Sequence, residues 1–447
     1  MDKHLQLAAI FRQQLPFLTA DNMSETSNQR IVVIGLGYVG LPLAVALAKS
    51  FDVTGFDIDQ RRVTELRQGH DRTHEVEQAA LGLSSLKLTH EASECGGADV
   101  YIVTVPTPVD ADNRPDLRPV ISATESVARM IDGSKRPIIV YESTVYPGVT
   151  DDICGPLLER ISGLKRGEDF FLGYSPERIN PGDREHTVDR IVKVVAGENP
   201  EITERLAELY GKVTSAGTFK AKSIKAAEAA KVIENAQRDI NIAFMNEITQ
   251  IFSKMDISIW DVLDAAGTKW NFLKFQPGLV GGHCIGVDPY YLSYRAQQLG
   301  QDPHVILSGR STNDGMGEWI ADQLHARRGN PGSALIMGLT FKENVPDLRN
   351  SRVIDVIRRL EVLGHTVNVH DPLADPQEAS HEYGIDLDSD GLGKNYDLVV
   401  VAVPHAAYAD LANQEITALL REGGLLADLK NLYGRVALPA SVQRWTL

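Results

Sequence analysis

The segment from Arg30 to Asp59 reads RIVVIGLGYVGLPLAVALAKSFDVTGFDID and decides the fold. An apolar run is followed by a glycine-rich turn, an Ala- and Leu-rich stretch with helical spacing, and a second apolar run. Short apolar runs bounded by glycine and polar residues are typical of buried strands. The segment therefore predicts a βαβ unit, the building block of a parallel sheet.

The glycines of this turn have the spacing of a dinucleotide site. Gly35, Gly37 and Gly40 form GxGxxG, in which the first permits a tight turn, the second admits a pyrophosphate and the third lets the helix pack on the strand. Asp57 lies 20 residues beyond Gly37, where its carboxylate would bind a ribose diol and repel a 2′-phosphate. The pattern predicts NAD rather than NADP as cofactor, and a βαβ turn without a ligand is the alternative.

The same architecture returns near the C-terminus, where apolar runs again alternate with a helical pattern at 352–363. Asp371 follows the second of these runs as Asp57 does in the first unit, which indicates a repeat of architecture rather than of sequence. Two doubly wound domains are the most economical interpretation. We expect strands at 99–105 and 137–141 in the first sheet, and at 333–339, 366–372, 396–404 and 423–429 in the second.

Between the two units, residues 223–255 contain neither proline nor glycine and predict one long connecting helix. Glu228, Lys231, Asn235 and Arg238 form a polar stripe, which from periodicity alone is most simply a solvated face. The other stripe is apolar, and its surplus surface predicts a homodimer or larger homo-oligomer. The apolar stripe consists of Ala229, Ile233, Ala236, Ile240, Ala243 and Phe244.

The fold class predicted is α/β, with two doubly wound Rossmann-like domains joined by a long central helix. The expected divisions are an N-terminal extension (1–28), an NAD-binding Rossmann domain (29–213), a central helical domain (214–318) and a second Rossmann-like domain (319–447).

Composition restricts the partners and the compartment. The 447 residues carry a formal net charge of −15, which opposes binding to nucleic acid. No apolar run approaches the roughly 20 residues that span a bilayer, so no membrane association is expected. The chain contains only three cysteines and no CxxC pair, which favours a reducing cytoplasm.

The third cysteine, Cys284, lies in GLVGGHCIGVDPYY, where glycines surround it. A glycine-rich loop brings backbone N–H groups close to a reacting atom, and a thiol there needs little help to become a nucleophile. Cys95 and Cys154 lack this setting and are expected to be buried. No metal site is expected, because His283, Cys284 and Asp288 point apart in an extended backbone and no second ligand cluster is visible.

Seven motifs occur in the order GxGYVGLP (35–42), VPTP (105–108), ESTVYPG (142–148), SPER (175–178), KVIEN (231–235), GGHCIGVDP (281–289) and GLTFKENVPDLRNS (338–351). In kind and order they resemble those of the nucleotide-sugar 6-dehydrogenases, the UDP-glucose/GDP-mannose dehydrogenase family. The resemblance covers almost the whole chain after the N-terminal extension.

The resemblance implies NAD-dependent oxidation of C6 of a nucleotide sugar by two hydride transfers, through an aldehyde and a cysteine thioester, to the acid. Cys284 matches the family's nucleophile, and Lys231 and Asn235 match the pair that stabilises the oxyanion. Because these two are i and i+4 on one helix, they point to one spot, and the polar stripe becomes part of an active site. The remaining catalytic matches are Asp288 near that lysine, Thr144 positioning a water and Glu177 acting in thioester hydrolysis.

The resemblance also implies binding residues. Cofactor contacts are expected from Gly35, Gly37, Tyr38, Val39, Gly40, Asp57, Arg62, Pro106, Thr107, Ser143, Thr144 and Arg349. Contacts to a UDP-sugar are expected from Glu177, Arg178, Lys231, Asn235, Phe275, Gly281 and Lys342.

Two departures from the UDP-glucose branch narrow the sugar. That branch usually has lysine before the active-site aspartate and a second glutamate in its PEFLAEG pattern, where this chain has Val287 and Pro181. Together with KWNFLKFQPG (269–278), these resemble the bacterial enzymes of capsule and O-antigen synthesis that act on UDP-N-acetylglucosamine (UDP-GlcNAc) or UDP-N-acetylgalactosamine (UDP-GalNAc). UDP-glucose and UDP-N-acetylmannosamine are the alternative substrates.

Two other functions are compatible with the glycine turn. A 3-hydroxyacid or 6-phosphogluconate type of dehydrogenase transfers one hydride and needs no cysteine. An NAD-sensing binding protein explains neither Cys284 in its glycine setting nor a second nucleotide domain.

Overall fold

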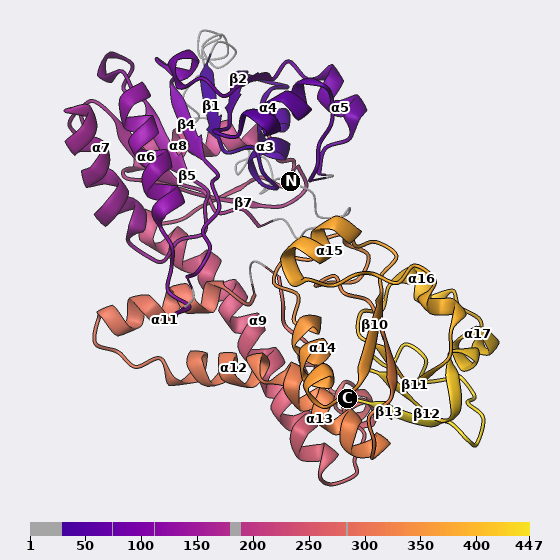
Figure 1. Cartoon of the computed structure of the whole chain (residues 1–447). Coiled ribbons are helices and arrows are strands. Elements are labelled where there is room, and N and C mark those ends of the chain that lie inside the picture. Colours follow the sequence, from indigo (N-terminus) through magenta and orange to yellow (C-terminus); the bar gives the residue numbers. More distant parts are fainter. Residues whose placement is uncertain (1–28, 74, 111, 179–188, 283–284) are drawn as a thin grey trace, which may run out of the picture.

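The computed structural model describes residues 29–73, 75–110, 112–178, 189–282 and 285–447. Two α/β units, one indigo to magenta and one orange to yellow, lie at the two ends of the long helix α9 (Ile224–Ser253) (Figure 1). Each unit is built on its own mainly parallel sheet. The predicted fold class is therefore confirmed.

The first sheet has, within the described residues, eight strands in the order β3-β2-β1-β4-β5-β6-β7-β8. Pairing is parallel except between β6 and β7, and Ile34 lies between Phe56 and Val103 in register. The strands are β1 (Arg30–Ile34), β2 (Asp52–Phe56), β3 (Lys87–Thr89), β4 (Val100–Val103), β5 (Ile138–Tyr141), β6 (Phe171–Tyr174), β7 (Lys193–Gly197) and β8 (Thr218–Lys220). The helices are α3 (Gly40–Leu47), α4 (Gln60–Arg67), α5 (Gln78–Leu83), α6 (Arg118–Met130), α7 (Gly155–Ser162) and α8 (Pro200–Gly211).

The order of the first sheet explains where its ligand edge lies. From β1 the chain continues to β2 and β3 on one side of the sheet and then returns to form β4 on the other side of β1. The turn after β1 therefore lies at a topological switch point, where doubly wound sheets bind their ligands. The two faces of the sheet are covered by separate apolar clusters. β8 pairs with β7, so the strand just beyond the expected division at 213 still belongs to this sheet.

The second sheet has five parallel strands among the described residues, in the order β10-β9-β11-β12-β13. They are β9 (Ser333–Met337), β10 (Thr366–His370), β11 (Tyr396–Val401), β12 (Leu420–Asp428) and β13 (Gln443–Thr446). The helices are α13 (Met316–Arg328), α14 (Val353–Val362), α15 (Pro376–Tyr383), α16 (Ala406–Ala409) and α17 (Asn413–Ala418). The four strands predicted for this unit are present, and the edge strand β13 was not predicted.

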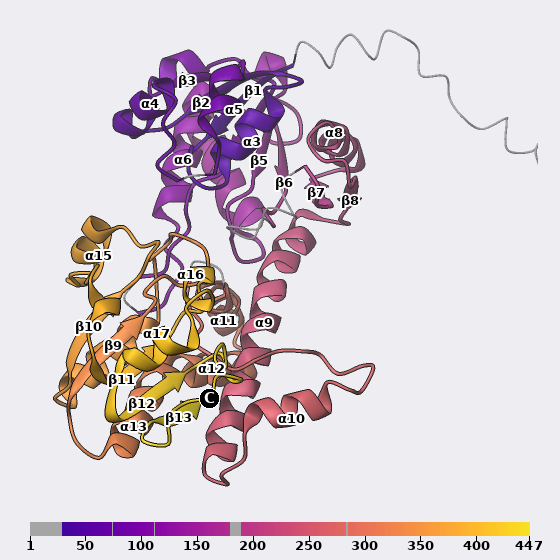
Figure 2. The same cartoon turned by 90° about the vertical axis from the view of Figure 1, so that its right-hand side faces the viewer.

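The central helix begins where predicted, because the side chain of Ser223 caps it by accepting a hydrogen bond from the N–H of Ala226 at 3.1 Å. α11 (Asp288–Gln298) and α12 (His304–Asp314) pack against it, and α10 (Ile259–Ala266) projects from its far end (Figure 2). Among the described residues, no helix is long and apolar enough to cross a bilayer.

The interpretation of the polar stripe as a solvated face is wrong for most of its members. Glu228, Lys231 and Asn235 are buried, and Arg238 is exposed. The reason is that the first unit and α11 cover this side of α9. Conversely, Ile233 and Phe244 of the apolar stripe are exposed by 59% and 56%.

Candidate active site

The turn after β1 has room for a pyrophosphate. Gly35 has φ +92°, which favours glycine, and a Cβ on Gly40 would lie 1.8 Å from the carbonyl oxygen of Gly35. Gly37 faces open space, since nothing lies within 4 Å of a Cβ placed there. Val39 precedes the first turn of α3, whose N–H groups face the same space. The residues therefore fit a dinucleotide.

Asp57 is fixed at the end of β2 and stays partly exposed. Its Oδ2 accepts a hydrogen bond from the N–H of Leu36 at 2.8 Å, and its Oδ1 accepts one from the N–H of Asp59 at 2.9 Å. Arg62 is buried beneath the turn, where it donates to the carbonyl of Leu36 at 2.9 Å and pairs with Asp71 at 2.7 Å. Arg62 thus supports the turn from below.

The loops after β4 and β5 line the same edge. The hydroxyl of Thr104 donates to the carbonyl of Gly35 at 2.8 Å, and that of Ser143 donates to the carbonyl of Val105 at 2.6 Å. These bonds hold the two loops against the glycine turn. Pro106 is exposed, and Thr107 and Thr144 are partly buried.

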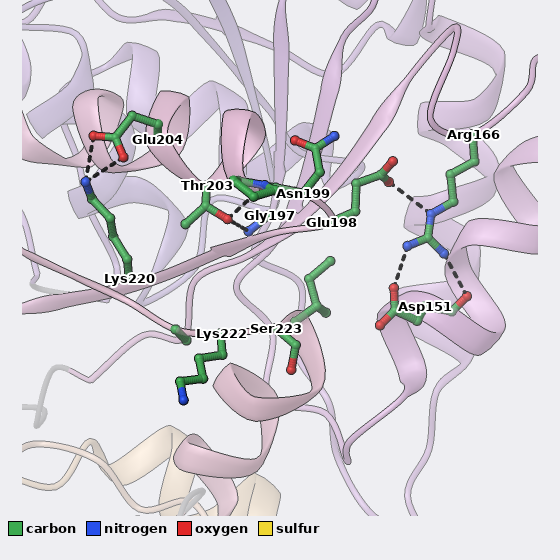
Figure 3. Close-up of a pocket in the computed structure, with 13 residues that line it drawn as sticks. Asp151, Arg166, Gly197, Glu198, Asn199, Thr203, Glu204, Lys220, Lys222 and Ser223 are labelled. Atoms are coloured by element: carbon green, nitrogen blue, oxygen red, sulfur yellow. Dashed lines mark hydrogen bonds and ion pairs between the residues drawn. The ribbon is translucent and has the colours of Figure 1, made fainter.

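A hollow of about 400 Å³ lies elsewhere on this unit, at the N-terminal ends of α8 and α9 (Figure 3). Arg166 on its wall is paired with Asp151 at 2.5 Å and with Glu198 at 3.0 Å, and Lys220 is paired with Glu204 at 2.5 Å. The charges on its wall are thus largely compensated, and none of the predicted site residues lines it.

The polar stripe of α9 meets the start of α11. The amide of Asn235 donates to Oδ2 of Asp288 at 2.5 Å, and Lys231, Asn235 and Asp288 are all at least nine-tenths buried. Burial raises the pKa of Asp288 to about 6, although the nearby Lys231 cation and the bond from Asn235 oppose the rise. The ammonium of Lys231, the amide of Asn235 and the carboxyl group of Asp288 are thus brought together away from solvent.

Glu177 lies on the short segment that follows β6. It is buried, and its Oε1 accepts a hydrogen bond from the N–H of Arg178 at 2.6 Å while its Oε2 pairs with Lys193 at 2.9 Å. The exposed side chain of Arg178 pairs with Glu234 of α9 at 2.6 Å. That contact ties the segment to the helix residue next to Asn235.

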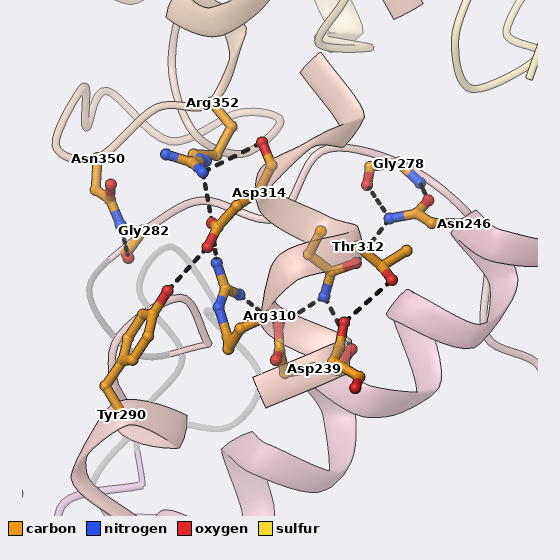
Figure 4. A network of polar contacts seen from close by, with 12 residues as sticks. Asp239, Asn246, Gly278, Gly282, Tyr290, Arg310, Thr312, Asp314, Asn350 and Arg352 are labelled. Atoms are coloured by element: carbon orange, nitrogen blue, oxygen red, sulfur yellow. Dashed lines mark hydrogen bonds and ion pairs between the residues drawn. The ribbon is translucent and has the colours of Figure 1, made fainter. Parts of the chain in front are cut away.

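The glycine loop that leads to Cys284 is held from two sides. Asn246 of α9 donates to the carbonyl of Gly278 at 3.0 Å, and the N–H of Gly282 donates to the carbonyl of Asn350 at 3.2 Å. A Cβ on Gly281 would lie 2.5 Å from that same carbonyl, so only glycine fits there. The second unit therefore approaches this loop at backbone distance (Figure 4).

Some of the sequence predictions fall outside the described residues. They are the N-terminal extension (1–28), Pro181 just after the SPER motif, and His283 and Cys284 in the glycine loop. The loop is described up to Gly282 and again from Ile285, which leads directly into α11 and Asp288.

A buried charge network that the sequence analysis missed fastens α9 to its neighbours. Arg310 of α12 pairs with Asp239 of α9 at 2.5 Å and also with Asp314 (Figure 4). Asp314 in turn accepts from the hydroxyl of Tyr290 at 2.9 Å and pairs with Arg352 at 2.5 Å. The network joins α9, α11, α12 and the start of α14.

The second unit also reaches the glycine turn. The guanidinium of Arg349 lies over the ring of Tyr38, with Cζ 4.0 Å from the ring centroid, and pairs with Asp347 at 2.6 Å. Lys342 lies in the same loop and is partly buried. The geometry brings Tyr38 and Arg349 together across the two units, as a shared cofactor site requires.

One further cation near the glycine loop was missed by the sequence analysis. Lys430, at the end of β12, donates to the carbonyl of Pro277 at 2.7 Å, close to the partly buried Phe275. Burial lowers the pKa of this ammonium, against the attraction of Glu343. The only available signal was its place at a strand's carboxyl end, the usual ligand edge of a doubly wound sheet.

Comparison with known proteins agrees with this arrangement. Models of the NAD binding domain, the central domain and the UDP binding domain of one family match residues 29–214, 225–315 and 335–435. The chain belongs to the UDP-glucose/GDP-mannose dehydrogenase family. It is an enzyme, an NAD-dependent nucleotide-sugar 6-dehydrogenase, and the predictions of family, activity and cofactor are confirmed.

Several relatives of this dehydrogenase are similar over nearly their full length. The UDP-N-acetyl-D-glucosamine 6-dehydrogenase of Pseudomonas aeruginosa is 51% identical over 410 residues, which cover 90% of this chain and 97% of the relative. Protein CapL of Staphylococcus aureus is 49% identical, with 94% and 100% covered. The solved UDP-D-ManNAc dehydrogenase of Pyrococcus horikoshii is 26% identical, has a TM-score of 0.82, and the likeness covers 93% and 99% of the two chains.

Among the described residues of the dehydrogenase, no group of three or more His, Cys, Asp or Glu is arranged to hold a metal ion. The two cysteines expected to be buried, Cys95 and Cys154, are buried and unpaired. Burial raises the pKa of Cys95 to about 11 and that of Cys154 to about 12, so neither is a ready nucleophile.

Proposed function

We propose that this enzyme oxidises C6 of a UDP-N-acetylhexosamine, UDP-GlcNAc or UDP-GalNAc, to the uronic acid through a thioester on Cys284. The observation that carries the proposal is the buried cluster of Lys231, Asn235 and Asp288 beside the glycine loop that leads to Cys284. Relatives that are 51% and 47% identical and are named UDP-N-acetyl-D-glucosamine 6-dehydrogenase support the sugar. So do Val287 and the segment 269–278 in the sequence.

NAD supplies the acceptor for the hydride that leaves C6 in each of the two oxidations. In the first, the C6 hydroxyl also loses its proton, and the carboxylate of Asp288, whose pKa burial raises to about 6, accepts it. The ammonium of Lys231 and the amide of Asn235 stabilise the negative charge that develops on the oxygen. The product of this step is the aldehyde.

A free aldehyde cannot lose a second hydride until a nucleophile adds to its carbon. The thiolate of Cys284 forms a C–S bond to C6, and the carbonyl oxygen becomes the oxyanion that Lys231 and Asn235 again stabilise. Loss of the second hydride restores the C=O bond and leaves a thioester. Water, positioned by Thr144, then attacks the thioester while Glu177 takes its proton, the C–S bond breaks, and the thiolate is released with the acid.

The cofactor site of the proposal is the edge formed by the glycine turn, Asp57 and the loops after β4 and β5. Tyr38 and Arg349 close it from the second unit's side. Lys430 brings positive charge to the loop that precedes Cys284, as an anionic UDP group requires, and Lys342 is the lysine that the family resemblance assigns to the nucleotide sugar. The bound molecule would thus lie between the two units, against α9.

NADH progress curves with UDP-GlcNAc, UDP-GalNAc, UDP-N-acetylmannosamine and UDP-glucose test the substrate. An acetamide pocket left partly empty by glucose loses contacts and leaves polar groups unpaired, so an N-acetylhexosamine should give the highest kcat/KM. The highest value for UDP-glucose would refute the assignment.

We also propose that the enzyme takes part in surface polysaccharide synthesis, as the name of Protein CapL suggests. The cytoplasmic location stays a prediction.

The covalent route is tested by stoichiometry. Two NADH should form per sugar consumed without accumulation of aldehyde. Cys284→Ala should abolish this turnover and leave NAD binding intact, because the cofactor edge lies on other loops. Cys154→Ala, at a buried cysteine outside the site, is the matched control and should keep the stoichiometry. Near-normal production of two NADH by Cys284→Ala would exclude the thioester.

A further inference from the structure

A buried lysine lies between two carboxylates behind the proposed active site. Nζ of Lys193 is 2.6 Å from Oε2 of Glu142 and 2.9 Å from Oε2 of Glu177. Side-chain exposure is 2% for Lys193, 0% for Glu142 and 8% for Glu177. Three neighbouring strands supply the three residues, since Glu142 follows β5, Glu177 follows β6 and Lys193 begins β7. A strand of the sheet itself therefore supplies the positive charge that pairs with Glu177.

The cluster is closed from behind by Tyr210 of α8. Its hydroxyl donates to Oε1 of Glu142, and its ring centroid is 5.3 Å from Nζ of Lys193. Burial raises the pKa of Glu142, as does the neighbouring Glu177, while Lys193 opposes the rise. Among the described contacts, Lys193 is the cation that bonds both carboxyl groups, and it favours their ionised forms away from water.

We propose that Lys193 is a positioning residue for the hydrolysis step, which holds Glu177 ionised and fixes the orientation of its carboxylate. The inference rests on the proposed function, in which Glu177 takes a proton from the attacking water. Glu177 must be without that proton when the thioester forms, and a buried carboxylate keeps its charge only beside a cation. Glu142 and Tyr210 serve in turn to hold Lys193.

Two groups of the cluster should shift the pKa of Glu177, and with it the pH dependence of hydrolysis, in opposite directions. Among the described residues, the charged and titratable groups around Glu177 include Lys193 of β7, Glu142 after β5, Tyr210 of α8, and Arg178 with its partner Glu234 of α9. Removing the cation should raise the pKa of Glu177, and removing the second carboxylate should lower it. A merely structural ion pair predicts no such opposition.

The test is the rate of disappearance of the covalent sugar adduct as a function of pH, followed by intact-protein mass in quenched single turnovers. In Lys193→Met the rising limb of this profile should move up by about 1–3 pH units, the usual effect of a neighbouring opposite charge on a carboxyl group. In Glu142→Gln, which is nearly isosteric, it should move to lower pH. KM for the UDP-sugar should change little in either variant.

Lys220→Met is the matched control, because Lys220 pairs with Glu204 at the surface of the neighbouring strand β8 and should leave the profile unchanged. Profiles that coincide with wild type in Glu142→Gln, or in a folded Lys193→Met, would overturn the role of Lys193. If Lys193→Met does not fold, Glu142→Gln decides alone. A wild-type enzyme that forms no covalent adduct would instead refute the proposed function itself.

Discussion

Asp57 has two tasks in the glycine turn. Each of its oxygens accepts one backbone N–H, from Leu36 and from Asp59, so the carboxylate is fixed before any ligand arrives. A carboxylate oxygen has a second lone pair, and both oxygens remain able to accept from a ribose diol. Its charge also makes the position unfavourable for a 2′-phosphate. Geometry and charge at this one residue therefore favour NAD.

We expect Asp57→Asn to weaken NAD and relax the rejection of NADP. The change keeps the size of the side chain but removes the charge and one acceptor, and hydrogen bonds to charged groups contribute about 1.5–3 kcal/mol, or roughly tenfold to a hundredfold in KM. The kcat/KM ratio of NAD to NADP measures the effect. Asp59→Asn is the control, since Asn caps α4 equally well. Equal use of both cofactors by the wild type would contradict the argument.

Residues of this site divide into those that a local pattern reveals and those that only the fold brings together. Gly40 and Asp57 belong to one short motif, so their roles follow from spacing. Lys193 and Asp239 were not predicted, because their partners Glu142 and Arg310 lie far along the chain and meet them only after strands and helices have packed. Pairing across elements leaves no periodic signal in a single sequence.

At the scale of the element, helix α9 shows which structural features periodicity can predict and which it cannot. The spacing predicted both the helix and its polar stripe. It did not predict which stripe is buried, because that depends on what packs on each side. In the structure the polar stripe faces the first unit and α11, and Lys231 and Asn235 are buried there. The resemblance to a family, not the periodicity, pointed to this outcome.

The ends of β2 and β10 carry the same residue for different purposes. Asp371 at the end of β10 accepts from the N–H of Leu339 at 2.6 Å and of Thr340 at 3.0 Å, much as Asp57 accepts from Leu36. Yet Asp371 is only 8% exposed, and His405 lies 3.1 Å from its Oδ2. The second unit thus uses its aspartate to hold a loop rather than a ribose.

Asp371 should give the fold an acid-sensitive contribution. Burial by itself would raise its pKa, but the bonds from His405, Leu339 and Thr340 outweigh this and hold the pKa well below its usual range. A carboxyl group with a depressed folded pKa contributes stability above about pH 4, and this is lost as the pH falls through the folded value.

Urea unfolding of Asp371→Asn measures that contribution. At pH 7 the variant should lose roughly 2–3 kcal/mol, the usual contribution of hydrogen bonds to a buried charge, and the difference from wild type should shrink toward pH 3. Asp375→Asn, a change at the exposed cap of α15, should be nearly neutral at both values. A deficit that stays constant with pH would show that the charge is not responsible.

At the scale of the whole molecule, one loop of the second unit reaches three parts of the site. Arg349 lies over Tyr38 of the glycine turn, Asn350 holds Gly282 in the loop before Cys284, and Arg352 pairs with α12. The sequence predicted the order of the units, and the family resemblance assigned Arg349 to the cofactor site, which stays a prediction. It could not predict the other two contacts, because they depend on how the units dock.

Large apolar side chains remain on the outer surface of α9 and the segment that follows it. Exposure is 59% for Ile233, 56% for Phe244, 58% for Met255, 92% for Trp270 and 59% for Leu273. Isolated exposed apolar residues are ordinary, but a series of them along one long helix and its projecting neighbour is typical of an interface. The expected homodimer stays a prediction, and this surface is where it would form.

We expect the wild type to sediment as a dimer at micromolar concentration and Phe244→Glu to dissociate it. A carboxylate buried at the centre of an apolar interface has no counter-ion there and would be costly to desolvate. The charge should leave the folded monomer unharmed, because Phe244 is more than half exposed in the single chain. Leu83→Glu, at an apolar side chain 89% exposed on α5, is the control and should stay dimeric. A wild type that is monomeric throughout this range would refute the interface, and a dimer that survives Phe244→Glu would move it to another face.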